Sequence, residues 1–221
     1  MALPRFEKLT ADRRHRLIAA AAMEFAAKGY QGAALVSIAE KSGIGKSSFY
    51  YYFVDKADLC ATVLQEAWRA LRADTRLKLE SVTKETFWPS LEALVRDNLE
   101  RCRREPWLRA AAKLLNRTPA DPSGATVLDD YHEKRREFEV AFVERGRALG
   151  AIRTDLPTDL LVTMSLSVRQ ASNLWLLERM ESGLTVDEGD RLALQVQATL
   201  RQLLSPPAAD ADETQSEDVP A

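Results

Sequence analysis

Histidine and cysteine are scarce in this chain, and their scarcity excludes several kinds of site. There are two histidines, His15 and His132, and two isolated cysteines, Cys60 and Cys102, with no CxxC pair. This set is too small and too widely spaced to form a zinc site, so we expect neither a metal nor another cofactor. The cysteines are expected to be reduced, buried thiols, with redox sensing as the alternative.

Long apolar runs are also missing. The N-terminus has no apolar leader, and no stretch of about 18 uncharged apolar residues occurs anywhere in the chain. We therefore expect a soluble protein of the cytoplasm that does not associate with membranes.

The usual catalytic signatures are absent as well. The sequence contains no G-x-S-x-G, no H-E-x-x-H and no phosphate-binding glycine loop, and its two histidines lie far apart. A nucleophile with a base and an orienting partner cannot be assembled from it, so an enzyme is not expected.

Charge is present but unevenly distributed. The 221 residues carry a formal net charge of −2, yet residues 1–56 hold nine Lys or Arg against five Asp or Glu, and the remainder hold 22 against 28. The last 17 residues contain five acids, no base and almost no large apolar side chain. These counts predict a basic N-terminal region and a disordered acidic tail over 205–221.

Residues 37–59, SIAEKSGIGKSSFYYYFVDKADL, read as two short helices joined by a turn. Gly43 lies where the first helix must stop, and glycine tolerates the left-handed backbone of a helix C-cap. Small Ala39 lies four residues earlier on the same helical face. The surrounding apolar side chains are spaced so that two crossed helices can share one core: Ile38, Ile44, Phe49, Tyr52 and Phe53. This arrangement predicts a helix-turn-helix.

The second of these helices, at about 45–52, has an outer side made of hydrogen-bond donors. No acidic side chain interrupts the sequence between Lys41 and Val54. The donors can reach phosphates or base edges of a nucleic acid: Lys46, Ser47, Ser48, Tyr50 and Tyr51. A helix-turn-helix used only for packing in an all-α interaction or scaffold protein remains the alternative.

Residues 13–59 resemble the DNA-binding domain of the TetR family of bacterial transcriptional regulators. Two departures occur at helix starts, where the family usually has Ser or Thr and this chain has Ala33-Ala34 and Gly45. The resemblance rests on a string of matching positions: Arg16, Leu17, Ala20, Ala21, Phe25, Gly29, Ile38, Ala39, Gly43, Ile44, Phe49, Tyr50, Tyr52, Phe53, Lys56 and Leu59.

The resemblance implies a function and roles for particular residues. Tyr50 and Lys56 match family positions that hold the DNA backbone, while Lys46, Ser48 and Tyr51 should face the groove. Gly45 gives the second helix no side-chain cap. The start of this helix can therefore lie in a slightly different position, so that Ser47 makes the base contact instead. The implied protein is a homodimeric, ligand-responsive repressor that binds a pseudo-palindromic operator.

Helical periodicity continues to about residue 204, and no alternating strand pattern occurs. We predict an all-α fold of about nine helices, with a three-helix DNA-binding domain over 1–56 and a helical effector-binding and dimerisation domain over 57–204. Expected helix starts are Thr10, Asp55 and the Thr185-Glu188 capping box. The expected helices cover 10–28, 56 to beyond 70, 84–104, 106–116, 125–149, 158–181 and 185–204, with a loop over 117–124.

Short basic segments surround the first helix. Residues 1–9 form an arm with Arg5 and Lys8, and Arg13, Arg14 and Arg16 ring the helix start. These arginines either form a solvated helix end or contact phosphate.

The middle helices carry large rings that can line an effector pocket or form ordinary core: Trp88, Trp107, Tyr131 and Phe138. Possible polar anchors for a ligand are His132, Arg135 and Arg169, and two of the three are expected to lie on the surface. The sequence alone identifies no ligand.

The last two long helices are apolar on more than one face, so they need more than one partner. The TetR resemblance implies that this pair meets its symmetry mate in a four-helix dimer interface. The expected interface residues are Met164, Val168, Leu174, Trp175, Val196 and Leu200.

Overall fold

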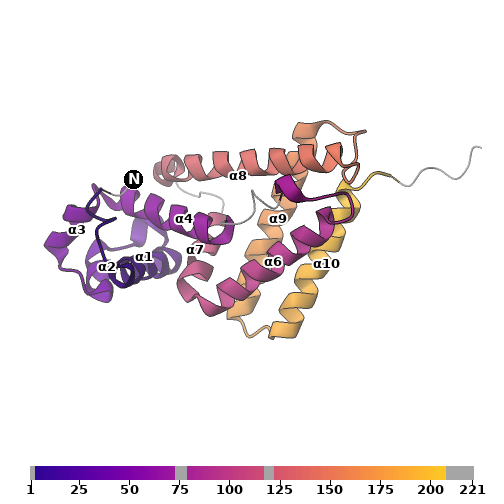
Figure 1. Cartoon of the computed structure of the whole chain (residues 1–221). Helices are drawn as coiled ribbons and strands as arrows, with labels where there is room; N and C mark the ends of the chain where they lie inside the picture. The colour runs from indigo at the N-terminus through magenta and orange to yellow at the C-terminus, as the bar shows by residue number, and fades with distance from the viewer. Residues whose placement is uncertain (1–2, 73–78, 117–121, 208–221) are drawn as a thin grey trace, which may run out of the picture.

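The computed structural model describes residues 3–72, 79–116 and 122–207, and these ranges contain α-helices, turns and no strand. The prediction of an all-α fold is confirmed. The N-terminal part contains four helices: α1 (Ala11–Gly32), α2 (Leu35–Ser42), α3 (Lys46–Tyr52) and α4 (Lys56–Arg72). Figure 1 shows α1, α2 and α3 grouped at one end of the molecule.

The rest of the described chain contains a helical stretch at 79–81 and five longer helices: α6 (Phe87–Arg104), α7 (Pro106–Asn116), α8 (Pro122–Ala148), α9 (Thr158–Glu181) and α10 (Val186–Leu204). In Figure 1, α7 lies between the N-terminal group and the long helices α6, α8, α9 and α10. The predicted loop 117–124 is too long, because α8 already begins at Pro122, where proline suits the first helical turn. Residues 117–121 and most of the predicted acidic tail (208–221) lie outside the described residues.

Helix starts follow the predicted local signals. The Thr10 side chain accepts a hydrogen bond from the backbone N–H of Arg13, and Asp55 Oδ1 accepts one from the N–H of Asp58 at 2.8 Å. Thr185 and Glu188 form a complete capping box at the start of α10. Caps of this kind depend only on residues a few positions apart, so the sequence is sufficient to predict them.

The first helix is longer than predicted. Gly29 adopts φ 70° and ψ 173°, which breaks the helical backbone, but the chain resumes a helical path and α1 ends at Gly32. The expected stop near Lys28 is therefore a kink inside α1.

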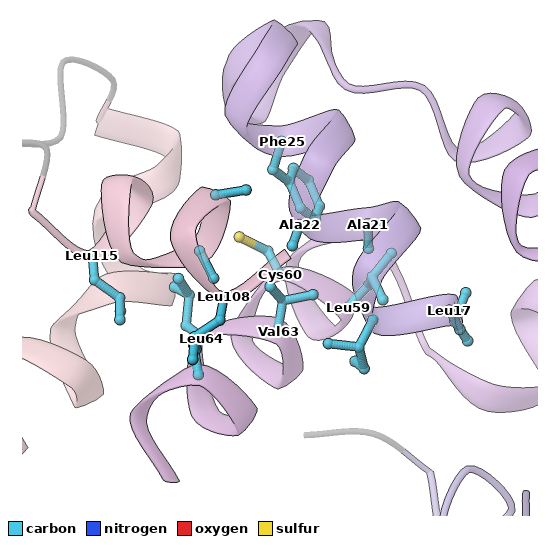
Figure 2. Packing of buried hydrophobic residues seen from close by; sticks show 14 of the residues in the cluster. Leu17, Ala21, Ala22, Phe25, Leu59, Cys60, Val63, Leu64, Leu108 and Leu115 are labelled. Carbon is cyan, nitrogen blue, oxygen red and sulfur yellow. The ribbon is translucent and has the colours of Figure 1, made fainter. Parts of the chain in front are cut away.

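A single apolar core joins the N-terminal helices to α7. Phe25 and Ala22 of α1 face Cys60 and Leu64 of α4, and α7 adds Leu108, Ala111 and Leu115 (Figure 2). The predicted domain boundary at 56/57 coincides with the start of α4, but α4 packs against α1 as well as α7 and α8. The division into two domains stays a prediction, because this core runs across the boundary.

A second core lies among α6, α8, α9 and α10. Phe87 of α6 stacks on Phe142 of α8 with ring centroids 4.9 Å apart, and Leu161 and Leu200 pack into the same cluster. Gly146 permits this close packing, since a Cβ there would lie 2.6 Å from Ile152 and 2.7 Å from Phe87.

Candidate functional site

The turn between α2 and α3 has the predicted geometry. Gly43 adopts the left-handed conformation, with φ 70° and ψ 23°, and the N–H of Ile44 donates to the carbonyl of Ala39 at 3.0 Å. Residues with a Cβ rarely adopt this backbone, so glycine fixes the sharp reversal between the two helices.

The two helices share the predicted core. Ile38, Phe49 and Phe53 are buried, and Ile44 and Tyr52 pack against them partly exposed. Phe6 from the N-terminal arm is fully buried and lies 5.2 Å from Phe53, ring centroid to ring centroid. The arm is therefore part of the helix-turn-helix core, a role that sequence reasoning missed.

The outer side of α3 presents aromatic donors to solvent. Tyr50 is 63% exposed and Tyr51 is 50% exposed, while Ser48 is half-buried. The side chains of Lys46 and Ser47 lie outside what the structure describes, so their roles stay predictions. The Arg5 guanidinium carbon lies 4.3 Å from the centroid of the Tyr51 ring, which brings a cation of the arm beside α3.

Lys56 binds its own chain. Its Nζ donates to the carbonyl oxygens of Gln31 at 3.0 Å and Ala33 at 3.3 Å, and it lies 4.9 Å from the Tyr30 ring centroid. An ammonium has three N–H donors, so one remains for a phosphate oxygen. Lys56 therefore holds the α1–α2 turn, whether or not it also contacts DNA as predicted.

The two departures from the family pattern have the expected structural consequence. Ala34 precedes α2 and Gly45 precedes α3, and neither helix start has a side-chain cap. These positions supply no hydroxyl to a phosphate.

The arginines at the start of α1 are partly neutralised by acids. Arg14 pairs with Glu7 at 3.0 Å, and Arg16 pairs with Asp12 at 3.0 Å. Both pairs are exposed and salt-sensitive, so they can open when a phosphate approaches.

Glu24 is a buried carboxylate that anchors α2 on α1. Its Oε2 accepts from Lys41 Nζ at 2.6 Å and from Ser37 Oγ at 3.0 Å, and the residue is 5% exposed. The hydrogen bond from Lys41 holds the pKa of Glu24 below its ordinary value, with Ser37 acting in the same direction against the effect of burial. The orientation of the helix-turn-helix therefore depends on an ionised Glu24.

Replacing Glu24 with glutamine should lower the free energy of unfolding by about 1 kcal/mol at pH 7. Because the folded pKa is lowered, the stabilisation by wild-type Glu24 is present above the ordinary pKa of 4.5 and is lost as pH falls through the folded pKa. Urea unfolding of both proteins at pH 7 and at pH 3 measures this difference, with Glu40→Gln on the exposed side of α2 as control. An equal difference in unfolding free energy between wild type and variant at both pH values would contradict the role of the ion pair.

A cavity of about 120 Å³ lies between α4, α6, α7, α8, α9 and α10. It has an apolar wall and three arginines, Arg72, Arg135 and Arg169, together with side-chain amides that include Asn98 and Gln197. The apolar wall is formed mainly by Leu91, Leu94, Leu99, Leu115, Leu176 and Val196.

The four predicted pocket residues lie in different places in the structure. Tyr131 lines this cavity, while Phe138 lines a smaller hollow beside Phe87 and Phe142. Trp88 is 6% exposed in the second core, and Trp107 packs against α1 with its ring centroid 6.0 Å from that of His15. Neither tryptophan lines the main cavity. The prediction failed at these positions because helical spacing does not determine which side of a helix faces a cavity.

The expectation that two of the three possible polar anchors lie on the surface is wrong, because two of them line the cavity. Arg135 and Arg169 line the cavity, whereas His132 is half-buried beside Tyr131 and is not part of the wall. Arg72, at the end of α4, is a third arginine that sequence reasoning missed. A run of alternating charged and apolar residues at a helix end gives no signal that one of its arginines lines a cavity.

The predicted dimer-interface residues differ in how far they are exposed on the monomer. Trp175 is 43% exposed and Met164, Val168 and Leu174 are half-buried, and Leu160, at 43% exposed, belongs to the same side of α9. Leu200 is fully buried in its own chain, and Val196 is half-buried and lines the cavity. In the monomer α10 turns this side toward α9 and α6, and the interface residues stay a prediction.

Both cysteines are buried, as predicted. Burial raises the pKa of the Cys60 thiol to about 12 and that of Cys102 to about 11. Both thiols stay protonated at neutral pH, and a protonated thiol is a poor nucleophile.

Two further searches cover the part of the chain that the structure describes. Within it, no group of three or more His, Cys, Asp or Glu side chains is arranged to hold a metal ion. None of the described helices combines the length and apolar character that crossing a membrane requires.

Comparisons with known proteins agree with this geometry. Residues 17–63 match the family model described as bacterial regulatory proteins, tetR family. The HTH-type transcriptional repressor AcnR of Corynebacterium diphtheriae is 24% identical over 189 residues, which cover 86% of this chain and 92% of that protein.

Two solved structures share the fold. The fatty acid degradation regulator FadR of Bacillus halodurans has a TM-score of 0.69 at 19% identity, covering 84% of this chain and 96% of that one. The transcriptional regulator FadR of Bacillus subtilis, solved in complex with stearoyl-CoA, has a TM-score of 0.68 at 16% identity with the same coverage. With the helix-turn-helix geometry of α2 and α3, the family match assigns residues 17–63 to the TetR family of bacterial regulatory proteins.

Proposed function

We propose that this protein is a ligand-responsive transcriptional repressor that binds a pseudo-palindromic operator as a homodimer. The observation that carries the proposal is the helix-turn-helix, with its left-handed Gly43, shared core and exposed Tyr50 and Tyr51. In such a motif the second helix docks in the major groove with its N-terminal residues toward base edges. That role falls to α3, and Lys46, Ser47 and Ser48 occupy its N-terminal end.

The relatives support a regulator in preference to an enzyme. AcnR is named as a repressor and the two FadR proteins as regulators. A repressor acts on the chromosome, so we place this protein in the cytoplasm.

Dimerisation is supported by the outer side of α9. A tryptophan and a leucine that are each 43% exposed, Trp175 and Leu160, stand near the two ends of this helix. Ser167 and Ala171 lie between them on the same side and are small enough to let a second helix approach closely. Association of two such surfaces would place two copies of α3 on half-sites about one helical turn apart.

The cavity supports control by a small molecule. FadR of Bacillus subtilis was solved with stearoyl-CoA, so a protein of this fold can hold a ligand. In this chain the cavity wall includes Arg72 and Leu71 of α4 and Ala112, Leu115 and Asn116 of α7, and both helices also pack against α1. A ligand that shifts α4 and α7 would move the DNA-binding helices in both subunits.

Titration of the full chain against DNA that flanks its own coding region tests the proposal. A labelled duplex should bind as a complex with two protein chains, and a scrambled duplex of equal length should bind at least about a thousandfold more weakly at physiological salt. Equal weak binding to both duplexes, or no binding to either, would favour the alternative of an all-α scaffold protein.

A further inference from the structure

The cavity contains more positive charge than its surroundings balance. Arg72, Arg135 and Arg169 come from three different helices, α4, α8 and α9, and the described residues that line the cavity include no acid. The buried carboxylate beside them is Glu139, which is 1% exposed. One carboxylate cannot neutralise three guanidinium groups.

Glu139 is already occupied by other partners. It accepts a hydrogen bond from Ser165 Oγ and another from Arg169 Nε at 3.3 Å. In the part of the chain that the structure describes, Arg72 and Arg135 form no ion pair, and Arg135 Nη2 donates to the carbonyl of Leu166 at 3.4 Å. Arg72 and Arg135 therefore have no directly paired carboxylate among the described residues, and Glu139 acts on Arg72 only through space.

The arginines are held by aromatic rings. The Arg72 guanidinium carbon lies 4.0 Å from the ring centroid of Phe138 and 4.9 Å from that of Trp68, and Arg169 lies 5.0 Å from that of Phe142. Burial lowers the pKa of Arg72 to about 10, and repulsion from Arg169 adds to this effect. The rings fix the orientation of these groups without neutralising their charge.

Buried polar atoms around the cavity also lack partners. Arg169 Nη2 makes no hydrogen bond although the Arg169 side chain is 10% exposed. Asn98 Oδ1 and Gln197 Oε1 are unsatisfied as well, and Gln197 is 6% exposed. Unpaired buried polar groups are costly, and Arg169 Nη2 is a donor that an anionic ligand would satisfy. The two amide oxygens are acceptors, so a carboxylate does not satisfy them.

From this cluster we infer that the effector is a small amphipathic acid. Its carboxylate lies between Arg72, Arg135 and Arg169, and its apolar body lies against Leu91, Leu94 and Leu176. The inference rests on the proposed function, since it names the class of ligand for the effector cavity. A cavity of about 120 Å³ matches a compact body, because an apolar void of about 150 Å³ accepts benzene.

The position of Arg72 gives such an acid a direct route to the DNA-binding helices. Arg72 is the last residue of α4, whose other end begins at Lys56 beside the α1–α2 turn. A carboxylate that binds Arg72 together with Arg135 and Arg169 ties α4 to α8 and α9. The bound state therefore fixes α4 in one position relative to the long helices.

Thermal melting and calorimetry of the full chain with matched ligands test the inference. The probes are benzoate and octanoate, each compared with the neutral alcohol and the amine of the same carbon skeleton. At least one acid should bind about tenfold or more tightly than its alcohol, since a charge-assisted hydrogen bond supplies that preference, and both amines should bind most weakly. If neither acid binds more tightly than its alcohol, the anionic assignment is overturned.

Variants separate a ligand site from a structural role. Arg169→Met should reduce the preference for the acid over the alcohol to about twofold or less, while Arg169→Lys should retain part of it. Arg104→Met, which removes an exposed arginine of α6 paired with Glu100, should leave the preference unchanged. An unchanged preference in Arg169→Met would remove Arg169 from the site even if the variant is less stable.

A DNA-binding measurement distinguishes the inference from the proposed function. Saturating acid should weaken operator binding, and saturating operator should weaken acid binding by the same factor. An acid that binds without changing operator affinity would overturn its role as effector while supporting the anion site. Operator binding in a protein that shows no preference for acids would overturn the inference and leave the repressor function standing.

Discussion

Leu200→Asp should prevent folding, whereas Trp175→Asp should give a folded monomer. Leu200 is 0% exposed and packs with Leu161 and Phe142, so an aspartate there loses apolar packing and buries an unpaired charge. Together these losses cost about 5 kcal/mol or more, which is comparable to the whole stability of many domains. Circular dichroism and analytical ultracentrifugation at micromolar concentration measure both outcomes.

Trp175 tests the outer side of α9 in isolation from the core. Its ring is 43% exposed, with the Arg179 guanidinium carbon 5.3 Å from the ring centroid, so a charge at this position leaves the monomer core intact. Met23→Asp is the matched control, because Met23 is 48% exposed on α1 and lies outside the proposed interface. A Trp175→Asp protein that remains dimeric would show that this side of α9 is not the interface.

The features that could be predicted from the sequence are those that depend on near neighbours. Gly43, Asp55 and Thr185 mark helix ends through hydrogen bonds that reach only a few residues. The shared core of α2 and α3 also follows from spacing, because Ile38 and Phe49 belong to one compact motif. Local chemistry therefore predicted the turn and shared core of α2 and α3 and most helix boundaries.

The features that could not be predicted depend on which side of a helix meets which neighbour. Helix α9 carries apolar residues on most of its sides, so periodicity does not distinguish buried Leu161 from exposed Trp175. Trp88 and Trp107 are large aromatic residues of the kind that line pockets, but Trp88 packs against Phe142 and Trp107 packs against His15. The assignment of side chains to core, cavity or surface required the arrangement of α6 to α10.

The cavity illustrates the same limit for charged residues. Arg72 and Arg104 both lie at helix ends, yet Arg72 is held over the Phe138 ring and Arg104 is exposed beside Glu100. Sequence spacing does not distinguish the environments of these two arginines, since the environment of Arg72 depends on the Phe138 ring of another helix.

Lys46→Ala should weaken binding to the operator by about 1–3 kcal/mol and have a much smaller effect on scrambled DNA. Lys46 opens α3, and the N-terminal residues of a recognition helix contact base edges. A lysine there can donate to guanine O6 or N7, and random sequence offers that contact only by chance. Fluorescence anisotropy with operator and scrambled duplexes over a range of salt concentrations measures both losses.

Lys56→Ala should have a different signature on the same two duplexes. The third N–H of Lys56 is predicted to hold a phosphate, so binding should weaken on both DNAs and the salt slope should fall by about 0.9. The variant should also melt at a lower temperature, because the carbonyls of Gln31 and Ala33 lose the Nζ donor. Lys28→Ala, at an exposed position of α1, is the control for general charge effects. An unchanged salt slope with a lower melting temperature would assign Lys56 to the α1–α2 turn alone, and equal losses on both DNAs for Lys46→Ala would remove Lys46 from base reading.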